Sequence, residues 1–285
     1  MCLPAGIRHN GIMEKHKEEN RYLNPAYESL LHYHQLDDFD RLWELEAEWF
    51  EEPNRRRGGW SGVCRLELQG KDGQVVPVFL KRQENHRART LRHPFKGIPT
   101  VRRELQNMLR FHAEGLPVPE ILYGADRICR GQVQGILLTR ELTGYRSLDD
   151  FLGEWYSLEL SESLLEQLLF PPLVAMIRTM HQRGFRYNCL YGKHIFVQVS
   201  PALSAPGGFP PELEEPQLRL SFIDLEKVRQ SCWKKRNIVR DLSQLKRHTN
   251  FSPLLWERFL DRYLDFLSHS AWIRAALGRR RRSRN

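Results

Sequence analysis

Three charged residues stand where they could act together on a phosphorylated ligand. Lys81 ends the apolar run VVPVFL, an expected strand, and a strand-end ammonium can act as a point charge on phosphate oxygens. Glu104 lies in the next expected helix and could pair with that amine. Asp224 follows the apolar run LRLSF, and a carboxylate there suits magnesium, which prefers oxygen ligands. Each residue alone is typical of an exposed charge or a turn, so only their order along the chain favours a shared site.

The segment RYNCLYGKHIFV, residues 186–197, adds two further candidates. His194 follows Cys189 by five positions, and a neutral imidazole can ligate a metal, although magnesium prefers oxygen. A histidine packed inside a loop is the alternative. A thiol is a poor substitute for a carboxylate base, and a thiolate beside anionic phosphates is disfavoured. We therefore interpret Cys189 as a space-filling residue and not as a nucleophile.

The stretch GGWSGV contributes Gly58, Gly59 and Gly62 as candidates for phosphate binding. Backbone N–H groups can approach an anion closely where no side chain intervenes. A tight hairpin turn would use the same residues, so this signal alone leaves both interpretations open.

Apolar periodicity predicts a strand-rich first half with one helix. Helical spacing extends over residues 36–52, until Pro53 and Asn54 interrupt it. A hairpin then follows, with strands over residues 63–68 and 75–81. An amphipathic helix over residues 100–114 is closed by Gly115, and two more strands are expected over residues 121–125 and 135–140.

The second half is mainly helical. Ser147 is expected to cap one helix, and residues 164–183 form a long helix that Pro171 and Pro172 should kink or break. The Pro- and Gly-rich residues 200–217 are expected to form an exposed insertion loop. Helices over residues 241–248 and 253–267 complete the pattern.

The amino-acid composition indicates a folded protein with acidic partners. Hydrophobic residues make up 41% and charged residues 28% of the 285, which predicts a packed core. The net charge of +9 favours acidic partners such as nucleotides, nucleic acid or an anionic membrane face. Arginine-rich segments at 55–57, 87–92 and 279–284 are either solvated chain or contacts to an anionic acceptor or lipid. We expect no nucleic-acid partner, because these runs lack interleaved aromatic residues.

Five scattered cysteines indicate neither a disulfide framework nor a zinc site, and they fit a reducing compartment. The N-terminal residues lack the apolar centre of a signal peptide, and no run of about 18 apolar residues occurs. We therefore expect a cytoplasmic protein, with a peripheral position at the inner membrane as an open alternative. Either Met1 or Met13 could be the start of translation.

Five ordered motifs carry a family resemblance. The stretches EEPNRRRGGWSGVCRL, VFLKRQ, RREL…GLPVPEILY, CLYGKHIFV and FIDLEKVR resemble the lipopolysaccharide core (Kdo/heptose) kinase family, and most of all its InaA-type branch. The resemblance covers roughly residues 36 to 250. It implies an α+β, protein-kinase-like fold of two lobes that uses ATP and magnesium. The implied division is an N-terminal extension (1–35), an N-lobe that binds the nucleotide phosphates (36–142), a mainly helical C-lobe (143–275) and a basic tail (276–285).

The resemblance also implies roles for individual residues. Lys81 would contact phosphates and pair with Glu104, and Asp224 would bind magnesium, with His194 as a second metal candidate. Two further roles are implied: Glu141 and Leu142 would lie at the adenine-binding hinge, and Asp241 would be a buried brace for the catalytic loop.

Cys189 departs from the family members that carry a His-Arg-Asp loop, because it stands where they have the catalytic aspartate. Two hypotheses follow. The chain is an ATP-dependent phosphotransferase acting on a sugar of the lipopolysaccharide inner core, or on another anionic acceptor. Alternatively, it is a nucleotide-binding pseudokinase or regulatory scaffold.

Overall fold

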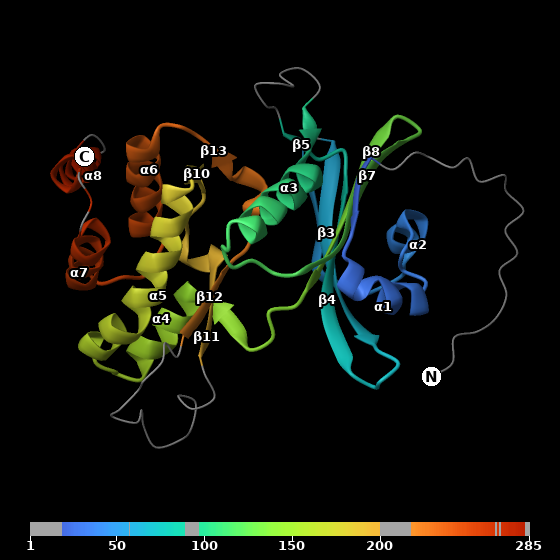
Figure 1. Cartoon of the computed structure of the whole chain (residues 1–285), viewed down its shortest axis with the longest axis horizontal. Coiled ribbons are helices and arrows are strands. Elements are labelled where there is room, and N and C mark those ends of the chain that lie inside the picture. Colours follow the sequence, from blue (N-terminus) through green and yellow to red (C-terminus); the bar gives the residue numbers. More distant parts are fainter. Residues whose placement is uncertain are drawn as a thin grey trace, which may run out of the picture.

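The computed structural model describes residues 19–56, 58–88, 97–199, 218–265, 267 and 269–282. Most of the second arginine-rich segment, the insertion at 200–217 and the last residues of the basic tail lie outside these ranges. Figure 1 shows a strand-rich lobe and a helix-rich lobe side by side, which confirms the α+β class. Among the described residues, no helix combines the length and the apolar character needed to cross a bilayer.

The first lobe is built on a six-stranded antiparallel sheet with the order β1-β7-β8-β4-β3-β2. Helices α1 and α2 cover one face, and α3 lies on the other face, towards the second lobe (Figure 1). The elements are β1 (Glu19–Leu23), α1 (Glu28–Tyr33), α2 (Phe39–Glu44), β2 (Trp49–Arg56), β3 (Gly59–Gln69), β4 (Val75–Glu84), the short pair β5 (Arg87–Ala88) and β6 (Ile98–Pro99), α3 (Thr100–Ala113), β7 (Ile121–Cys129) and β8 (Gln132–Arg140).

Helix α3 packs unusually close to the sheet. Its apolar stripe includes Val101 and Leu105, both buried. A Cβ added to Gly124 would lie 2.9 Å from Leu105, and one added to Gly135 would lie 3.0 Å from Val101. These two glycines in the strands therefore make room for the helix. The expected helix over 100–114 is confirmed, and Gly115 follows it with a positive φ of 69°.

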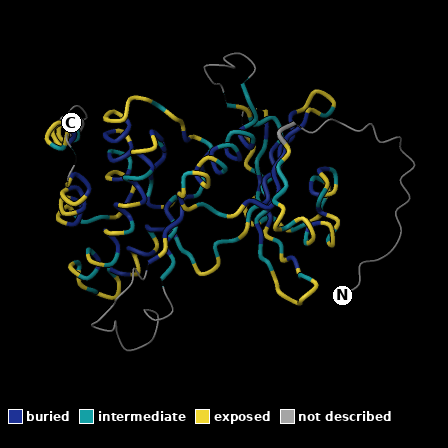
Figure 2. Tube along the Cα trace, viewed as in Figure 1, coloured by how far each residue is buried: buried dark blue, intermediate teal, exposed yellow. Residues whose placement is uncertain are grey.

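The second lobe places helices around a smaller sheet. Its elements are β9 (Tyr145–Ser147), α4 (Leu148–Ser157), α5 (Glu162–Gln182), β10 (Phe185–Arg186), β11 (Ile195–Val199), β12 (Leu218–Phe222), β13 (Arg229–Gln230), α6 (Lys234–Arg247), α7 (Pro253–Leu264) and α8 (Ser270–Arg282). The strands form a sheet of order β12-β11-β9 and a separate ribbon of β10 with β13. Figure 2 shows that the buried segments concentrate in the large sheet and in the centre of this lobe.

The helix expected over residues 36–52 is wrong in its second half. Helix α2 ends at Glu44, and residues 49–56 form β2, an edge strand of the large sheet. An edge strand tolerates Pro53, which the helical interpretation had taken as a stop. The two tryptophans that suggested helical spacing, Trp43 and Trp49, instead approach Trp60 of β3 from different elements.

One further expectation, the break at the paired prolines, is not met. Helix α5 continues as one element through Pro171 and Pro172, so the paired prolines do not break it. Strand β1 lies within the segment assigned to an N-terminal extension, yet it pairs with β7 at the edge of the sheet. Helix α8 spans the expected boundary at residue 276, and Ile273 anchors it in the core.

Candidate active site

A cavity of about 1090 Å³ opens between the two lobes. Side chains from both lobes line it, and Lys81, Glu104, His194 and Asp224 are among the predicted functional residues in its wall. These residues come from β4, α3, the turn before β11 and the turn after β12. Segments that are far apart in the sequence thus meet at one place.

Lys81 and Glu104 form a buried ion pair. Lys81 Nζ lies 2.7 Å from Glu104 Oε2, and Glu104 is 5% exposed. Lys81 lies in the middle of the sheet, opposite Val63 of β3 and Leu137 of β8. Side chains alternate between the faces of a strand, so Leu80 joins the core beneath α1 and α2 while Lys81 faces the cavity.

The charge of Lys81 is secured by its surroundings. Burial by itself opposes the charge, but the attraction of Glu104 and Asp224 outweighs burial and raises the pKa of Lys81 above its ordinary value. The ammonium therefore stays protonated throughout the physiological range. It offers a fixed positive charge at the wall of the cavity, where phosphate oxygens could bind.

Asp224 adopts a backbone conformation that is rare for residues other than glycine. Its φ of 58° and ψ of 59° lie in the left-handed region. The flanking chain holds this conformation: Ile223 N donates to His194 O at 3.1 Å, and Tyr187 Oη donates to Ile223 O. The result is a sharp turn that directs the carboxylate into the cavity. Strain of this kind is concentrated at functional sites.

His194 and Asp224 together suit a metal ion. His194 Nδ1 lies 2.9 Å from Cys189 O and donates to it, so Nε2 of the neutral ring carries a lone pair. That lone pair faces Asp224 Oδ2 at 3.4 Å. Burial lowers the pKa of His194 despite the nearby Asp224, which keeps the ring neutral. His194 Nε2 and Asp224 Oδ2 are thus two hydrogen-bond acceptors with no proton between them, and a cation bound between them would stabilise this arrangement.

The described residues include no group of three or more His, Cys, Asp or Glu side chains placed to hold a metal ion. Magnesium commonly takes only one or two protein ligands and completes its shell with phosphate oxygens and water. One carboxylate and one imidazole at the cavity could therefore hold a magnesium ion whose remaining ligands are phosphate oxygens and water.

The loop that follows β10 is fixed by Asp241 of α6. Asp241 is fully buried, and its carboxylate accepts hydrogen bonds from Tyr187 N at 2.7 Å and Asn188 N at 2.9 Å. His181 Nε2 of α5 lies 3.2 Å from the same carboxylate. One side chain thus joins α5, α6 and the loop that carries Cys189. This arrangement matches the bracing role that the resemblance implied for Asp241.

Cys189 itself is almost completely buried. It is 6% exposed and belongs to the hydrophobic cluster of the second lobe. Its thiol lies close to the Tyr191 hydroxyl and the Lys227 ammonium. This burial agrees with the interpretation of Cys189 as a residue that fills space.

The three candidate glycines have structural explanations. Gly58 lies in the turn between β2 and β3 with a φ of 77°, whereas Gly59 and Gly62 are part of β3. A Cβ at Gly59 would lie 2.4 Å from Glu84 O, and one at Gly62 would lie 2.6 Å from the Trp49 ring. The cavity is instead lined at this strand by Ser61 and Val63. Phosphate binding by the glycines stays a prediction.

Glu141 and Leu142 follow β8 and line the cavity where the chain passes to the second lobe. Glu141 N donates to Pro77 O at 2.9 Å, and its carboxylate pairs with Arg65 at 2.7 Å. The segment is thus firmly attached to the first lobe. Its position at the connection between the lobes is compatible with the hinge role, which stays a prediction.

Asp149 of α4 is a further residue of the cavity, and the sequence did not predict it. Asp149 lines the cavity beside Lys193, and its carboxylate lies near the backbone N–H groups of Lys193 and Asn250. Burial raises the pKa of Asp149. The stretch SLDDFL gave only a capping signal, which the structure confirms, since Asp150 N donates to Ser147 Oγ. Nothing in the local pattern indicated that the neighbouring carboxylate turns into the cavity.

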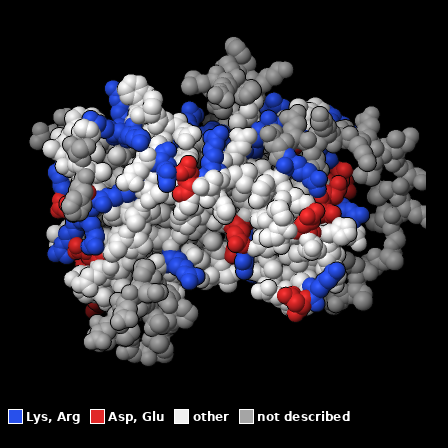
Figure 3. All heavy atoms as spheres, viewed as in Figure 1, with Lys and Arg blue, Asp and Glu red and all other residues white. Residues whose placement is uncertain are grey.

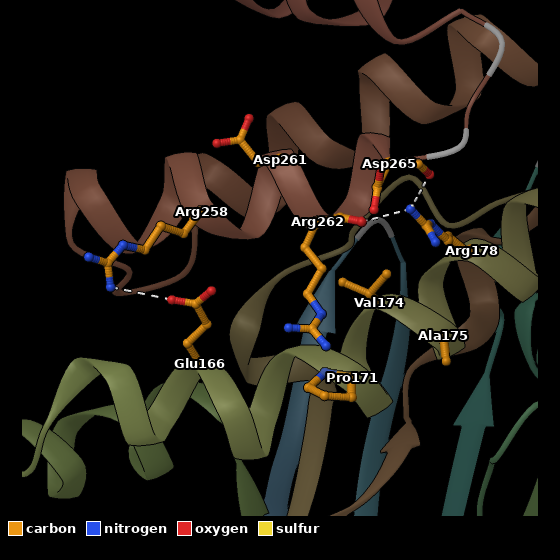
Figure 4. A pocket seen from close by; sticks show the side chains of 9 residues that line it. All are labelled: Glu166, Pro171, Val174, Ala175, Arg178, Arg258, Asp261, Arg262 and Asp265. Carbon is orange, nitrogen blue, oxygen red and sulfur yellow. Dashed lines mark hydrogen bonds and ion pairs between the residues drawn. The ribbon is translucent and has the colours of Figure 1, made fainter.

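A second cavity, of about 860 Å³, lies between α5 and α7. Figure 4 shows Arg258 paired with Glu166, and Arg178 directed at backbone oxygens. Arg258 Nη1 lies 3.3 Å from Glu166 Oε2, and Arg178 donates to the carbonyl groups at the end of α7, including Tyr263 O at 2.9 Å. Lining residues of this cavity already bind one another or the backbone, so the cavity between the lobes is the better candidate for ligand binding.

Comparison with known proteins agrees with this geometry. The family model described as "Lipopolysaccharide kinase (Kdo/WaaP) family" matches residues 40–263. Protein InaA of Escherichia coli (strain K12) is 29% identical over 223 residues, which cover 78% of this chain and 93% of InaA. The solved structure described as WaaP in complex with acyl carrier protein has a TM-score of 0.63 at 20% identity, covering 93% of this chain and 99% of that chain. The expected protein-kinase-like fold and the expected family are both confirmed.

Proposed function

Because the chain belongs to the lipopolysaccharide kinase (Kdo/WaaP) family, we propose that it is an ATP-dependent phosphotransferase whose acceptor is a sugar hydroxyl of the lipopolysaccharide inner core. One observation supports this most directly. The Lys81–Glu104 pair and the facing groups of Asp224 and His194 line the same cavity between the lobes. A cation on one wall and two metal-ligating groups on the other form a site for a nucleotide phosphate chain.

Each residue has a distinct part in the proposed reaction. Lys81 binds a phosphate oxygen and neutralises its charge, and Glu104 orients the ammonium. Asp224 and His194 hold magnesium, which neutralises charge on the phosphoryl oxygens when it is bound. Phosphoryl transfer depends mainly on positioning and charge neutralisation, so these residues supply much of what the reaction needs.

The chain lacks an aspartate at position 189, which distinguishes it from relatives with a carboxylate base. A general base is worth about 10²–10⁴-fold in rate, so its absence slows transfer without excluding it. The loop around Cys189 is otherwise rigid, because Asp241 binds two of its N–H groups. We therefore propose a slow kinase, acting at the cytoplasmic side of the inner membrane where core sugars are assembled.

Transfer of label from ATP to core oligosaccharide tests the proposal. We expect wild-type protein and Lys71→Ala to transfer label, because Lys71 is an exposed turn residue away from the cavity. Lys81→Ala and Asp224→Ala should reduce transfer to background. Background transfer by the wild type, or unchanged transfer in both cavity variants, would reject the proposal.

The alternative is a nucleotide-binding pseudokinase, and Cys189 is the observation that favours it. Thermal unfolding with ATP and magnesium separates a nucleotide binder from an empty fold, since a ligand at 100 times its Kd adds about 2.7 kcal/mol of stability. Cys189→Asp then separates the two functions. A large gain in transfer indicates a site that lacks only its base, whereas binding without transfer in both proteins supports the pseudokinase.

A further inference from the structure

Two arginines of the second lobe face each other across a two-stranded ribbon. Arg186 of β10 is the direct partner of Arg229 of β13 in the antiparallel pairing. Like charges directly opposite each other in a sheet are destabilising. Arg186 is only partly exposed, and its Nε is buried without a hydrogen-bond partner among the described residues. An unpartnered donor of this kind costs free energy unless a ligand satisfies it.

A third arginine reaches the same place from the first lobe. Asn107 of α3 donates to Val228 O at 3.1 Å, and Val228 directly precedes Arg229. Arg103 lies one helical turn before Asn107 and therefore on the same face of α3. Arg103 is partly buried, and the described residues give it no ion pair.

A fourth arginine, Arg240, lies near Arg186, and Arg240 and Arg229 are both exposed. Arg240 of α6 directly precedes Asp241, whose carboxylate binds the backbone immediately after Arg186. Burial, and then repulsion by Arg240 and Arg229, lower the pKa of Arg186. Burial, and then repulsion by Arg229, lower that of Arg103. Figure 3 shows Lys and Arg side chains gathered on this face over α6 and towards α3.

The carboxylates nearby do not neutralise the four guanidinium groups. Asp241 attracts Arg186, but its buried carboxylate is already occupied by Tyr187 N, Asn188 N and His181. Glu226 attracts Arg103, but it also faces the cavity and lies 3.8 Å from Lys227 Nζ. The cluster therefore retains an excess of positive charge at the boundary between the lobes.

We propose that Arg103, Arg186, Arg229 and Arg240 form a binding site for a phosphate-class anion, separate from the nucleotide cavity. The planar guanidinium groups donate pairs of hydrogen bonds that match the oxygens of phosphate. Bound there, the anion satisfies Arg186 Nε and removes the repulsion across the β10–β13 ribbon. It also joins α3 to the second lobe.

The position of Arg103 gives this site a functional consequence. Arg103 directly precedes Glu104, the partner of Lys81. An anion that fixes Arg103 against β13 therefore fixes α3 in the position that the ion pair requires. This consequence rests on the proposed kinase function, whereas binding of the anion does not.

Calorimetric titration with inorganic phosphate, in buffer free of phosphate and sulfate, tests the site. Arg186→Gln and Arg229→Gln should each weaken binding about tenfold or more, because each loses charge-assisted hydrogen bonds. Arg183→Gln is the matched control, since Arg183 is exposed and pairs with Glu114 outside the cluster. Lys81→Ala should weaken binding less than Arg186→Gln or Arg229→Gln does, which separates this site from the nucleotide cavity.

Melting without phosphate gives a second measurement. Arg229→Gln should melt at or above the wild-type temperature, because it removes the repulsion across the ribbon. A lower melting temperature, absence of phosphate binding by the wild type, or equal binding by wild type and both cluster variants would overturn the proposal. Loss of binding in Lys81→Ala alone would also overturn it, since the phosphate would then occupy the cavity.

The source of the anion is resolved by comparing sugar ligands. Glucose 6-phosphate that binds more tightly than inorganic phosphate, while glucose does not bind, indicates a phosphoryl group carried by a saccharide. Equal affinities indicate free phosphate. Both results support the site if they depend on Arg186 and Arg229.

Discussion

Asp224 combines a functional carboxylate with a strained backbone. Its left-handed conformation costs residues other than glycine about 1–3 kcal/mol, which the packing of the surrounding turn must offset. Removing the side chain should therefore separate stability from function at this position.

We predict that the free energy of unfolding of Asp224→Gly is about 1 kcal/mol higher than that of the wild type, because glycine adopts this conformation without strain. The variant should therefore unfold at a higher denaturant concentration. The same variant should lose stabilisation by ATP with magnesium. Asp224→Asn keeps a residue that tolerates the left-handed region and should unfold like the wild type. Urea denaturation with and without nucleotide measures both effects. If Asp224→Gly were less stable without nucleotide, strain at this residue would be excluded.

Gly192 permits the close approach of Asp149 to the loop that carries Cys189. A Cβ at Gly192 would lie 2.0 Å from Asp149 Oδ1, an atom that is already buried. We predict that Gly192→Ala destabilises the protein by about 1–3 kcal/mol through overpacking. Gly153→Ala is the control, since it meets nothing within 4 Å in α4 and should stabilise by about 0.5–1 kcal/mol. Equal unfolding midpoints for the two variants would contradict this view of the Asp149 contact.

Some functional residues could be predicted from their side-chain type and their order along the chain. Lys81, Glu104 and Asp224 follow recognisable strand and helix patterns, so their convergence could be predicted. Asp149 could not, because its carboxylate lies against Gly192 and near the backbone of Lys193 and Asn250, far away in the chain. A contact that depends on tertiary structure leaves no periodic signal.

At the scale of elements, Asp241 shows how one buried side chain orders several segments. Asp241→Ala removes the acceptor for Tyr187 N and Asn188 N, and it leaves both donors buried. We predict a loss of about 3 kcal/mol or more in the free energy of unfolding.

Asp261→Ala is the control for Asp241→Ala. Its side chain is 68% exposed and pairs with Arg274, so it should cost less than about 1 kcal/mol. Chemical denaturation of both variants gives the comparison. Similar losses would show that Asp241 does not brace the loop.

The elements that were predicted incorrectly share a physical cause. Residues 49–52 continued a helical spacing by coincidence, but pairing with β3 at the sheet edge determines their conformation. Helix α5 tolerates Pro171 and Pro172 because burial of Leu169, Phe170 and Leu173 stabilises the helix around them. In both cases tertiary packing outweighs the local preference that the sequence displays.

At the scale of the whole molecule, the cavity exists only while the two lobes keep their relative positions. Asn107 of α3 contributes directly to this arrangement. Its buried amide donates to Leu225 O at 2.8 Å and to Val228 O at 3.1 Å. Both carbonyl groups belong to the turn that follows Asp224. The apolar face of α3 joins the core of the second lobe, so the helix is shared between the lobes.

We predict that Asn107→Ala costs about 1–3 kcal/mol of stability, because two carbonyl groups lose a buried partner. The variant should also bind nucleotide more weakly, although Asn107 does not contact the phosphates. The Asn107 amide joins α3, which carries Glu104, to the turn that follows Asp224. Gln106→Ala, at the adjacent position of the same helix, should change neither quantity appreciably. Thermal unfolding with increasing ATP and magnesium measures both. A variant that lost stability but kept the nucleotide affinity of the wild type would show that the lobes are positioned without this contact, and that α3 acts only through the Lys81–Glu104 pair.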